Sequence, residues 1–126
     1  MKDFRKLMVW QEAHQVTLDL YPITQAFPPE ERYGLTSQIR RSSASIGATI
    51  AEGCGKGSEV EFCRFLQMSS GSASELAYHL ILARDLGYLA VPKFADLSLR
   101  VERVQKMLAG LISKISASKK SRAAGA

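Results

Sequence analysis

The sequence contains little of what membrane spans, disulfide frameworks and signal peptides are built from. Its apolar residues never form a run of the roughly 18 needed to cross a bilayer, so it predicts no membrane span. Its two cysteines, Cys54 and Cys63, form no CxxC pair, which favours free thiols over a disulfide or a zinc site. The first residues, MKDFRKLMVWQEAHQ, are too polar for a signal peptide. We therefore expect a cytoplasmic protein.

The groups that carry most enzyme chemistry are also scarce. The chain has two histidines, His14 and His79, and neither belongs to the Glu-x-x-His pairs of a di-metal helical bundle, because Leu76 precedes His79 by three residues. The glycine-rich segment 53–58, GCGKGS, lacks the spacing of a phosphate-binding P-loop and is typical of a turn. The serines have no histidine and acid at a spacing that would activate them. The sequence thus predicts no catalytic residue, no metal site, no cofactor and no enzyme activity.

Helical periodicity is what the sequence does contain. Apolar residues recur every three or four positions along four segments, and no segment alternates as a strand would. The pattern predicts an all-α bundle over residues 1–115, with a flexible basic tail at 116–126. Pro22 lies inside the first segment and predicts a kink or two consecutive helices. The predicted helices span about 9–27, 34–53, 59–86 and 92–115.

Two of these helices carry side chains that indicate close packing on more than one side. The second helix has mostly small residues between Ser42 and Ala51, so neighbouring helices can approach its backbone. Ser58 caps the third helix and Gly87 ends it. The third helix is apolar almost all round from Leu76 to Ala83, which predicts a subunit interface at Tyr78, Ile81 and Leu82. Its predicted inner stripe is Phe62, Phe65, Leu66, Ser69, Ala73, Leu76, Leu80 and Ala83.

The charge of the chain is unevenly distributed. The net charge is +5; residues 1–92 carry nine Lys and Arg against ten Asp and Glu, whereas residues 93–126 carry eight against two. A basic C-terminal helix and tail favour an anionic partner such as nucleic acid, although a solvated helix face has a similar composition. The hypothesised phosphate contacts are Arg100, Arg103, Lys106, Lys114, Lys119, Lys120 and Arg122.

Four motifs in order along residues 4 to 112 carry a family resemblance. They are LMVWQEAH at 7–14, ERYGLTSQIRR at 31–41, a segment at 45–53 that begins Ser-Ile and ends IAEG, and GSASEL at 71–76. Together with the Phe-Leu pair at 65–66, they resemble the bacterial four helix bundle protein family. Its members are also called intervening-sequence proteins, because some are encoded within large-subunit ribosomal RNA genes. The chain departs from the family at Pro22, and near Gly47 and Thr49 where relatives usually have proline and asparagine.

The resemblance implies a left-handed, antiparallel up-down-up-down bundle that assembles as a ring-like homopentamer. One group of relatives, the accessory proteins of diversity-generating retroelements, forms basic pentamers that bind nucleic acid and a reverse transcriptase, and for most members no activity is established. The recurring polar positions of the family map to Arg40, Arg41, Glu52 and Glu75. These four residues either bind a partner or hold the bundle together, and the usual role of paired buried charges favours the second.

Composition and resemblance together predict a non-enzymatic, self-assembling bundle that binds RNA or DNA through backbone phosphates with little sequence specificity. The alternative is a protein-interaction scaffold without a nucleic-acid ligand, in which the basic tail serves solubility. In both cases the predicted assembly is a homo-oligomer, most simply a pentamer.

Overall fold

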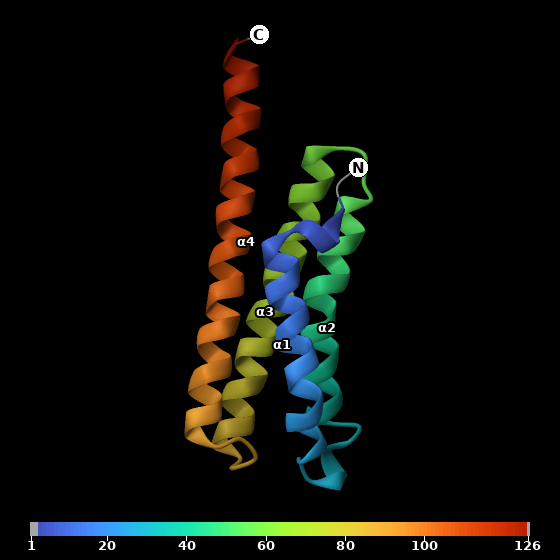
Figure 1. Cartoon of the computed structure of the whole chain (residues 1–126), viewed down its shortest axis with the longest axis vertical. Coiled ribbons are helices and arrows are strands. Elements are labelled where there is room, and N and C mark those ends of the chain that lie inside the picture. The colour runs from blue at the N-terminus through green and yellow to red at the C-terminus, as the bar shows by residue number, and fades with distance from the viewer. Residues whose placement is uncertain (1–2, 126) are drawn as a thin grey trace.

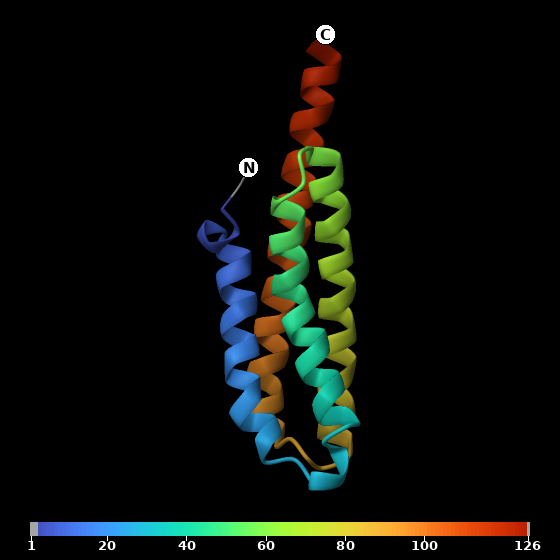
Figure 2. The same ribbon diagram turned by 90° about the vertical axis from the view of Figure 1, so that its right-hand side faces the viewer.

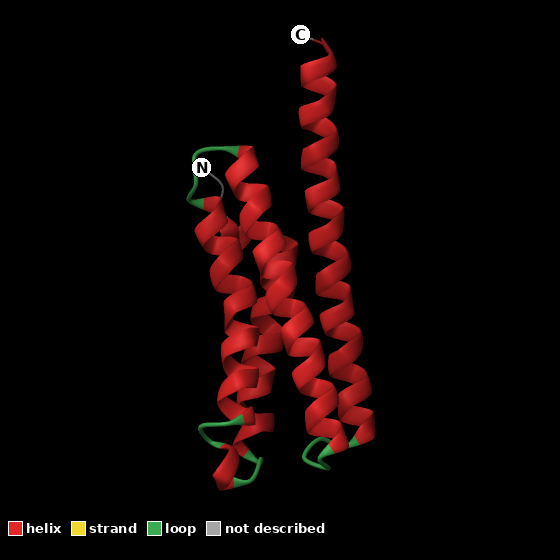
Figure 3. Ribbon diagram, turned by 180° about the vertical axis from the view of Figure 1, so that it is seen from behind, coloured by secondary structure: helices red, strands yellow, loops and turns green. Residues whose placement is uncertain are grey.

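The computed structural model describes the backbone of residues 3–125 and the side chains of residues 3–118, and all of its long elements are helices (Figures 1 and 3). No strand occurs within this range, so the all-α prediction is confirmed. No helix in it has the length and apolar character needed to span a membrane. The elements are η1 Phe4–Lys6, α1 Met8–Gln25, η2 Pro29–Glu31, α2 Leu35–Cys54, α3 Glu59–Asp85 and α4 Val91–Gly125.

Local chemistry accounts for where the helices begin and end. The Ser58 hydroxyl accepts a hydrogen bond of 3.2 Å from the Glu61 amide and so satisfies one of the free donors at the start of α3. Gly87 follows α3 with a φ of +81°, a conformation that side chains disfavour. Pro22 lies within α1, which is one helix, so the alternative of two consecutive helices is wrong. Only three residues of α1 follow Pro22, so the helix continues for less than one turn beyond it.

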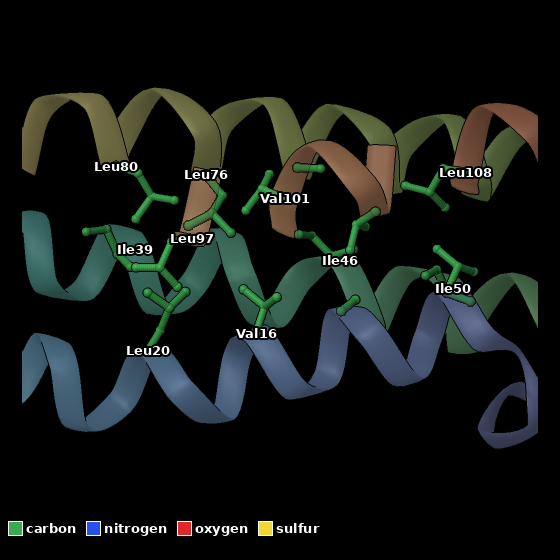
Figure 4. Packing of buried hydrophobic residues seen from close by; sticks show 14 of the residues in the cluster. Val16, Leu20, Ile39, Ile46, Ile50, Leu76, Leu80, Leu97, Val101 and Leu108 are labelled. Atoms are coloured by element: carbon green, nitrogen blue, oxygen red, sulfur yellow. The ribbon is translucent and has the colours of Figure 1, made fainter. Parts of the chain in front are cut away.

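The four helices lie side by side around one apolar core (Figure 2). The α1–α2 and α3–α4 connections lie at one end of the molecule and the α2–α3 connection lies at the other. Every helix contributes side chains with at most 1% exposure to the centre (Figure 4). These include Val16 and Leu20 of α1; Ile39, Ile46 and Ile50 of α2; Leu76 and Leu80 of α3; and Leu97, Val101 and Leu108 of α4.

Small hydroxyl side chains connect α2 to both of its neighbours. Thr17 of α1 and Ser43 of α2 share a hydrogen bond of 2.7 Å, and Ser45 shares one of 2.9 Å with Ser72 of α3. The buried Ser69 hydroxyl of α3 donates to the Ile46 carbonyl oxygen at 2.9 Å. Such short links require the helices to approach closely, as the small residues of α2 predict.

The last helix is longer than the sequence pattern predicts. α4 continues to Gly125 and extends beyond the other helices, whereas the predicted helix ends at 115 and is followed by a flexible tail (Figures 1 and 2). The apolar seam of α4 does end at the buried Ile115, so packing does not explain the extension. Local propensity does, because the segment 116–124 consists of Ala, Ser, Lys and Arg without glycine or proline.

Candidate nucleic-acid interface

Two arginines of the predicted phosphate-binding set, Arg100 and Arg103, lie opposite acidic side chains of α1. Arg100 Nη2 donates to Asp19 Oδ2 at 2.8 Å, and its Nη1 lies 3.8 Å from Asp96 Oδ2 on the preceding turn of α4. Arg103 Nη2 lies 3.6 Å from Glu12 Oε1. The hydrogen bond from Arg100, followed by one from Gln15, lowers the pKa of Asp19. Both arginines therefore have carboxylate partners within the chain.

Lys106 is paired in the same way. Its Nζ lies 3.3 Å from Glu102 Oε1, one turn away on α4. A surface hollow of about 320 Å³ lies on this part of α4. It is lined by Asp96, Arg100, Glu102, Arg103, Lys106 and the exposed Leu99. Three cations thus face four acids, Glu12, Asp19, Asp96 and Glu102. A phosphate group bound here would compete with carboxylates, so this face has no surplus of positive charge.

The composition of α4 changes after Glu102, because no Asp or Glu follows it in the chain. Lys114 is exposed on the described part of this acid-free end. The backbone of residues 119–125 continues the helix, while the side chains of Lys119, Lys120 and Arg122 lie outside the described residues. The structure thus separates the seven predicted contacts into an ion-paired group at 100–106 and an acid-free group from 114 onward.

Among the family polar positions, Arg40 joins α2 to the last turn of α1. Its Nε donates to Thr24 Oγ1 at 2.9 Å, and its Nη2 donates to the Tyr21 carbonyl oxygen at 3.2 Å and to Gln25 Oε1 at 3.4 Å. The guanidinium carbon also lies 4.6 Å from the centre of the Tyr21 ring. Arg40 therefore joins α1 to α2 through neutral groups, and no carboxylate among residues 3–118 pairs with it.

The other three family positions are exposed. Arg41 and Glu52 lie on the outside of α2, and Glu75 lies on the outside of α3. Within residues 3–118, none of them forms an ion pair, with Arg40 or with one another. The chain does not bring the four positions together as buried charge pairs, so the structural interpretation applies to Arg40 alone.

The predicted subunit interface on α3 is partly uncovered in the single chain. Tyr78 and Ile81 are 58% and 40% exposed, whereas Leu82 is half-buried. The opposite side of the same turns is buried, as Leu76 and Leu80 have at most 1% exposure. The apolar side chains on this part of α3 therefore include two that the described residues leave largely exposed, Tyr78 and Ile81.

Sequence reasoning missed the ion pairs that occupy Arg100, Arg103 and Lys106. Two of the four ion pairs are predictable from the sequence, because Asp96–Arg100 and Glu102–Lys106 have the i, i+4 spacing of neighbours on a helix. The pairs with Asp19 and Glu12 depend on how α1 and α4 are aligned, which helical periodicity does not specify. No group of three or more His, Cys, Asp or Glu side chains in the described part of the chain is arranged to hold a metal ion.

Comparisons with known proteins agree on the family and the fold. A solved structure from Bacteroides thetaiotaomicron, a protein of unknown function from the S23 ribosomal protein family, superposes with a TM-score of 0.77 at 23% sequence identity. The superposition covers 83% of this chain and 98% of the other. No curated protein matches the chain. The family model of the 23S rRNA-intervening sequence proteins matches residues 5–110, and the chain therefore belongs to that family.

Proposed function

We propose that this protein is a non-enzymatic, self-assembling bundle that binds the phosphate backbone of RNA or DNA through the C-terminal end of α4. The observation that carries the proposal is the acid-free composition of this end, where Lys114, Lys119, Lys120 and Arg122 follow one another without a carboxylate. Cations without acidic neighbours release counterions when they meet phosphates. The extension of α4 beyond the other helices supports the proposal, because it leaves this end accessible (Figure 1).

The ion-paired residues Arg100, Arg103 and Lys106 have a secondary role in this proposal. Each would have to leave a carboxylate to meet a phosphate, so each contributes less than a free cation. Backbone phosphates look alike in every sequence, and binding is therefore expected to be strongly salt-dependent and weakly sequence-specific.

Self-assembly completes the proposed function. The helices are proposed to form an antiparallel, left-handed up-down-up-down bundle, and the alternating ends of the connections support this arrangement (Figure 2). The exposed Tyr78 and Ile81 support an interface on α3, with Leu82 at its edge. In a ring of five copies, each basic helix end is weak alone, and several together bind one nucleic acid with raised avidity.

Fluorescence anisotropy with a structured RNA tests the nucleic-acid proposal. The triple variant Lys119→Glu, Lys120→Glu, Arg122→Glu should weaken binding by more than tenfold at about 50 mM salt and flatten its dependence on salt. The control Arg103→Gln removes one ion-paired cation and should change affinity by less than threefold. Equal losses in both variants, or an affinity that salt does not change, would contradict binding through the end of α4.

The second candidate is a protein-interaction scaffold, favoured by the exposed Tyr78 and Ile81. It requires a protein partner that stays bound after nuclease treatment of a cell extract and is lost when both residues are changed to glutamate. Retention of a partner under these conditions, together with no measurable affinity for RNA, would replace the nucleic-acid proposal with the scaffold.

A further inference from the structure

A polar pocket of about 390 Å³ lies where the end of α1, the following connection and the start of α2 meet. Its lining includes Arg32, Arg40, Thr24, Thr36, Gln25 and the segment 27–29. Two of these side chains are cationic, three carry neutral hydrogen-bonding groups, and none is acidic. The pocket differs in this respect from the face of α4 where Arg100, Arg103 and Lys106 each have a carboxylate partner.

The guanidinium of Arg40 is held in place with part of its donor capacity unused. Thr24, Gln25 and the Tyr21 carbonyl oxygen accept hydrogen bonds from its Nε and Nη2. Its Nη1 donates to no acceptor within residues 3–118. A fixed guanidinium loses little conformational entropy when it binds a further acceptor, so this group is preorganised for an oxyanion.

Arg32 supplies a second uncompensated charge. Its guanidinium carbon lies 5.5 Å from the centre of the Tyr33 ring, and its side chain forms no ion pair or hydrogen bond with residues 3–118. The side chain is exposed, so it can move toward a ligand in the pocket. Arg32 and Arg40 together give the pocket a charge of two, which matches a doubly charged oxyanion.

Of the nearest acids in the sequence, Glu31 is engaged elsewhere and Glu30 is exposed at the surface. Glu31 Oε2 accepts a hydrogen bond of 3.0 Å from the Tyr88 hydroxyl, and its Oε1 accepts one of 3.1 Å from the Leu35 amide. The hydrogen bond to Glu31 is the main cause that raises the pKa of Tyr88, and the charge of Glu30 adds to it. Within residues 3–118, neither carboxylate forms an ion pair with either arginine of the pocket.

We propose that this pocket binds the phosphate monoester group of a small molecule. A monoester carries up to two negative charges and several acceptor oxygens, which suit two guanidinium groups and the Thr36 hydroxyl. The volume of the pocket lies within the range of roughly 300–1,000 Å³ typical of small-molecule sites. The buried Phe27 and its neighbouring prolines form an apolar wall for the rest of the molecule.

This site goes beyond the proposed nucleic-acid function and is spatially separate from it. The α1–α2 connection and the C-terminal end of α4 lie at opposite ends of the molecule (Figure 1). A chain that stops after Ile115 lacks three of the four acid-free cations and keeps the whole pocket. The two proposals can therefore fail independently.

Isothermal titration calorimetry with adenosine monophosphate tests the site, with adenosine as the ligand that lacks the phosphate. The wild-type chain should bind the monophosphate and not adenosine. Arg32→Gln should weaken binding about tenfold or more, because a hydrogen bond to a charged group is lost. Arg64→Gln is the matched control: it removes an exposed arginine of α3 that does not line the pocket, and it should leave the affinity unchanged. The chain that stops after Ile115 should bind as the wild type does.

Arg40 requires a conservative variant, because its replacement by alanine removes contacts that hold α1 to α2. Arg40→Lys keeps the positive charge and should weaken the binding of adenosine monophosphate. Circular dichroism verifies that the helices of this variant remain folded. The proposal is overturned if the monophosphate does not bind, if adenosine binds equally well, or if Arg64→Gln and Arg32→Gln have the same effect. A hydroxyl-ended oligonucleotide contains only diester phosphates. If Arg32→Gln weakens the binding of this oligonucleotide as much as it weakens the binding of the monophosphate, the assignment of the pocket to a phosphate monoester is wrong.

Discussion

At the scale of single residues, two helical glycines differ sharply in what a side chain would meet. A Cβ atom at Gly53 would lie 2.7 Å from Phe65 Cβ and 3.2 Å from Phe62 Cδ1, and both phenylalanines are buried. A Cβ atom at Gly71 would have no neighbour within 4 Å. The first glycine therefore permits α2 and α3 to approach, and the second has no packing role in the single chain.

The matched substitutions test this difference. Gly53→Ala should lower the free energy of unfolding by about 1–3 kcal/mol, because α2 and Phe65 must move apart. Gly71→Ala should raise it by about 0.5–1 kcal/mol, because alanine favours the helix and meets open space. Urea denaturation measures both. If both substitutions change the free energy of unfolding in the same direction, the close approach of α2 and α3 does not restrict the size of the side chain at Gly53.

The ionisation of the Asp19 carboxylate makes the free energy of unfolding depend on pH. Its pKa is lowered in the folded chain, first by Arg100 and then by Gln15, relative to an unfolded value of about 3.9. The resulting stabilisation is present above the unfolded pKa and is lost as the pH falls through the folded pKa. Since the side chain is 40% exposed, we expect a contribution of only about 0.2–1 kcal/mol.

Asp19→Asn should therefore reduce the free energy of unfolding near neutral pH, and its effect should shrink as the pH falls through the folded pKa and the wild-type carboxyl is protonated. Urea unfolding of both chains across this range gives the difference directly. Asp85→Asn serves as a control, because the one ion pair of that carboxylate among the described residues is with the adjacent Arg84 on α3, so it joins no two helices. A difference between wild type and Asp19→Asn that persists at low pH would assign the effect to packing.

At the scale of helices, the end of α4 is expected to contribute binding without contributing to the fold. The seam of α4 ends at Ile115, and the described residues that follow it, Ser116 to Ser118, are exposed. A chain that stops after Ile115 should change the free energy of unfolding by less than about 0.5 kcal/mol, as surface changes do. Its affinity for RNA should fall because three cations are lost. A large loss of thermal stability would mean that the extension packs against another copy or another helix.

Helical periodicity predicted the buried side of each helix better than it predicted how the helices meet. All eight residues of the inner stripe predicted for α3 are buried, because burial repeats with the helical turn. Leu97, Val101, Val104 and Leu108 of α4 are buried for the same reason. The cap at Ser58 and the helix end at Gly87 are also predictable from the sequence, because each depends on residues within one helical turn.

Contacts between helices were harder to predict, because they depend on the alignment of segments far apart in the chain. Arg100 was assigned to phosphate from charge alone, and its pairing with Asp19 depends on how α1 and α4 are aligned. The pocket of Arg32 and Arg40 was missed for a similar reason, as it forms only when the end of α1 meets the start of α2. The extent of α4 to Gly125 differs from the helix end expected at 115, because propensity without an apolar seam extends that helix.

At the scale of the whole molecule, the uncovered apolar side chains of α3 argue for assembly. Tyr78 and Ile81 lie three residues apart on the same side of a helix whose opposite side is buried in the core. We expect light scattering to give a mass near five times the 13.9 kDa of one chain. Tyr78→Glu with Ile81→Glu should reduce it to that of a single chain, because burying two carboxylates in an apolar interface is costly.

The control for this experiment changes two apolar side chains on other helices that are also at least 40% exposed. Leu18 and Leu99 are 49% and 69% exposed, and their replacement by glutamate should leave the mass unchanged. The single-chain variant also tests why assembly matters, because it keeps every cation of α4 and loses only their multiplicity. Its affinity for a long RNA should fall by more than about tenfold, while its affinity for an RNA that reaches only one helix end should not change. Equal affinities for the long RNA before and after dissociation would show that one α4 end is sufficient and that the ring serves another purpose.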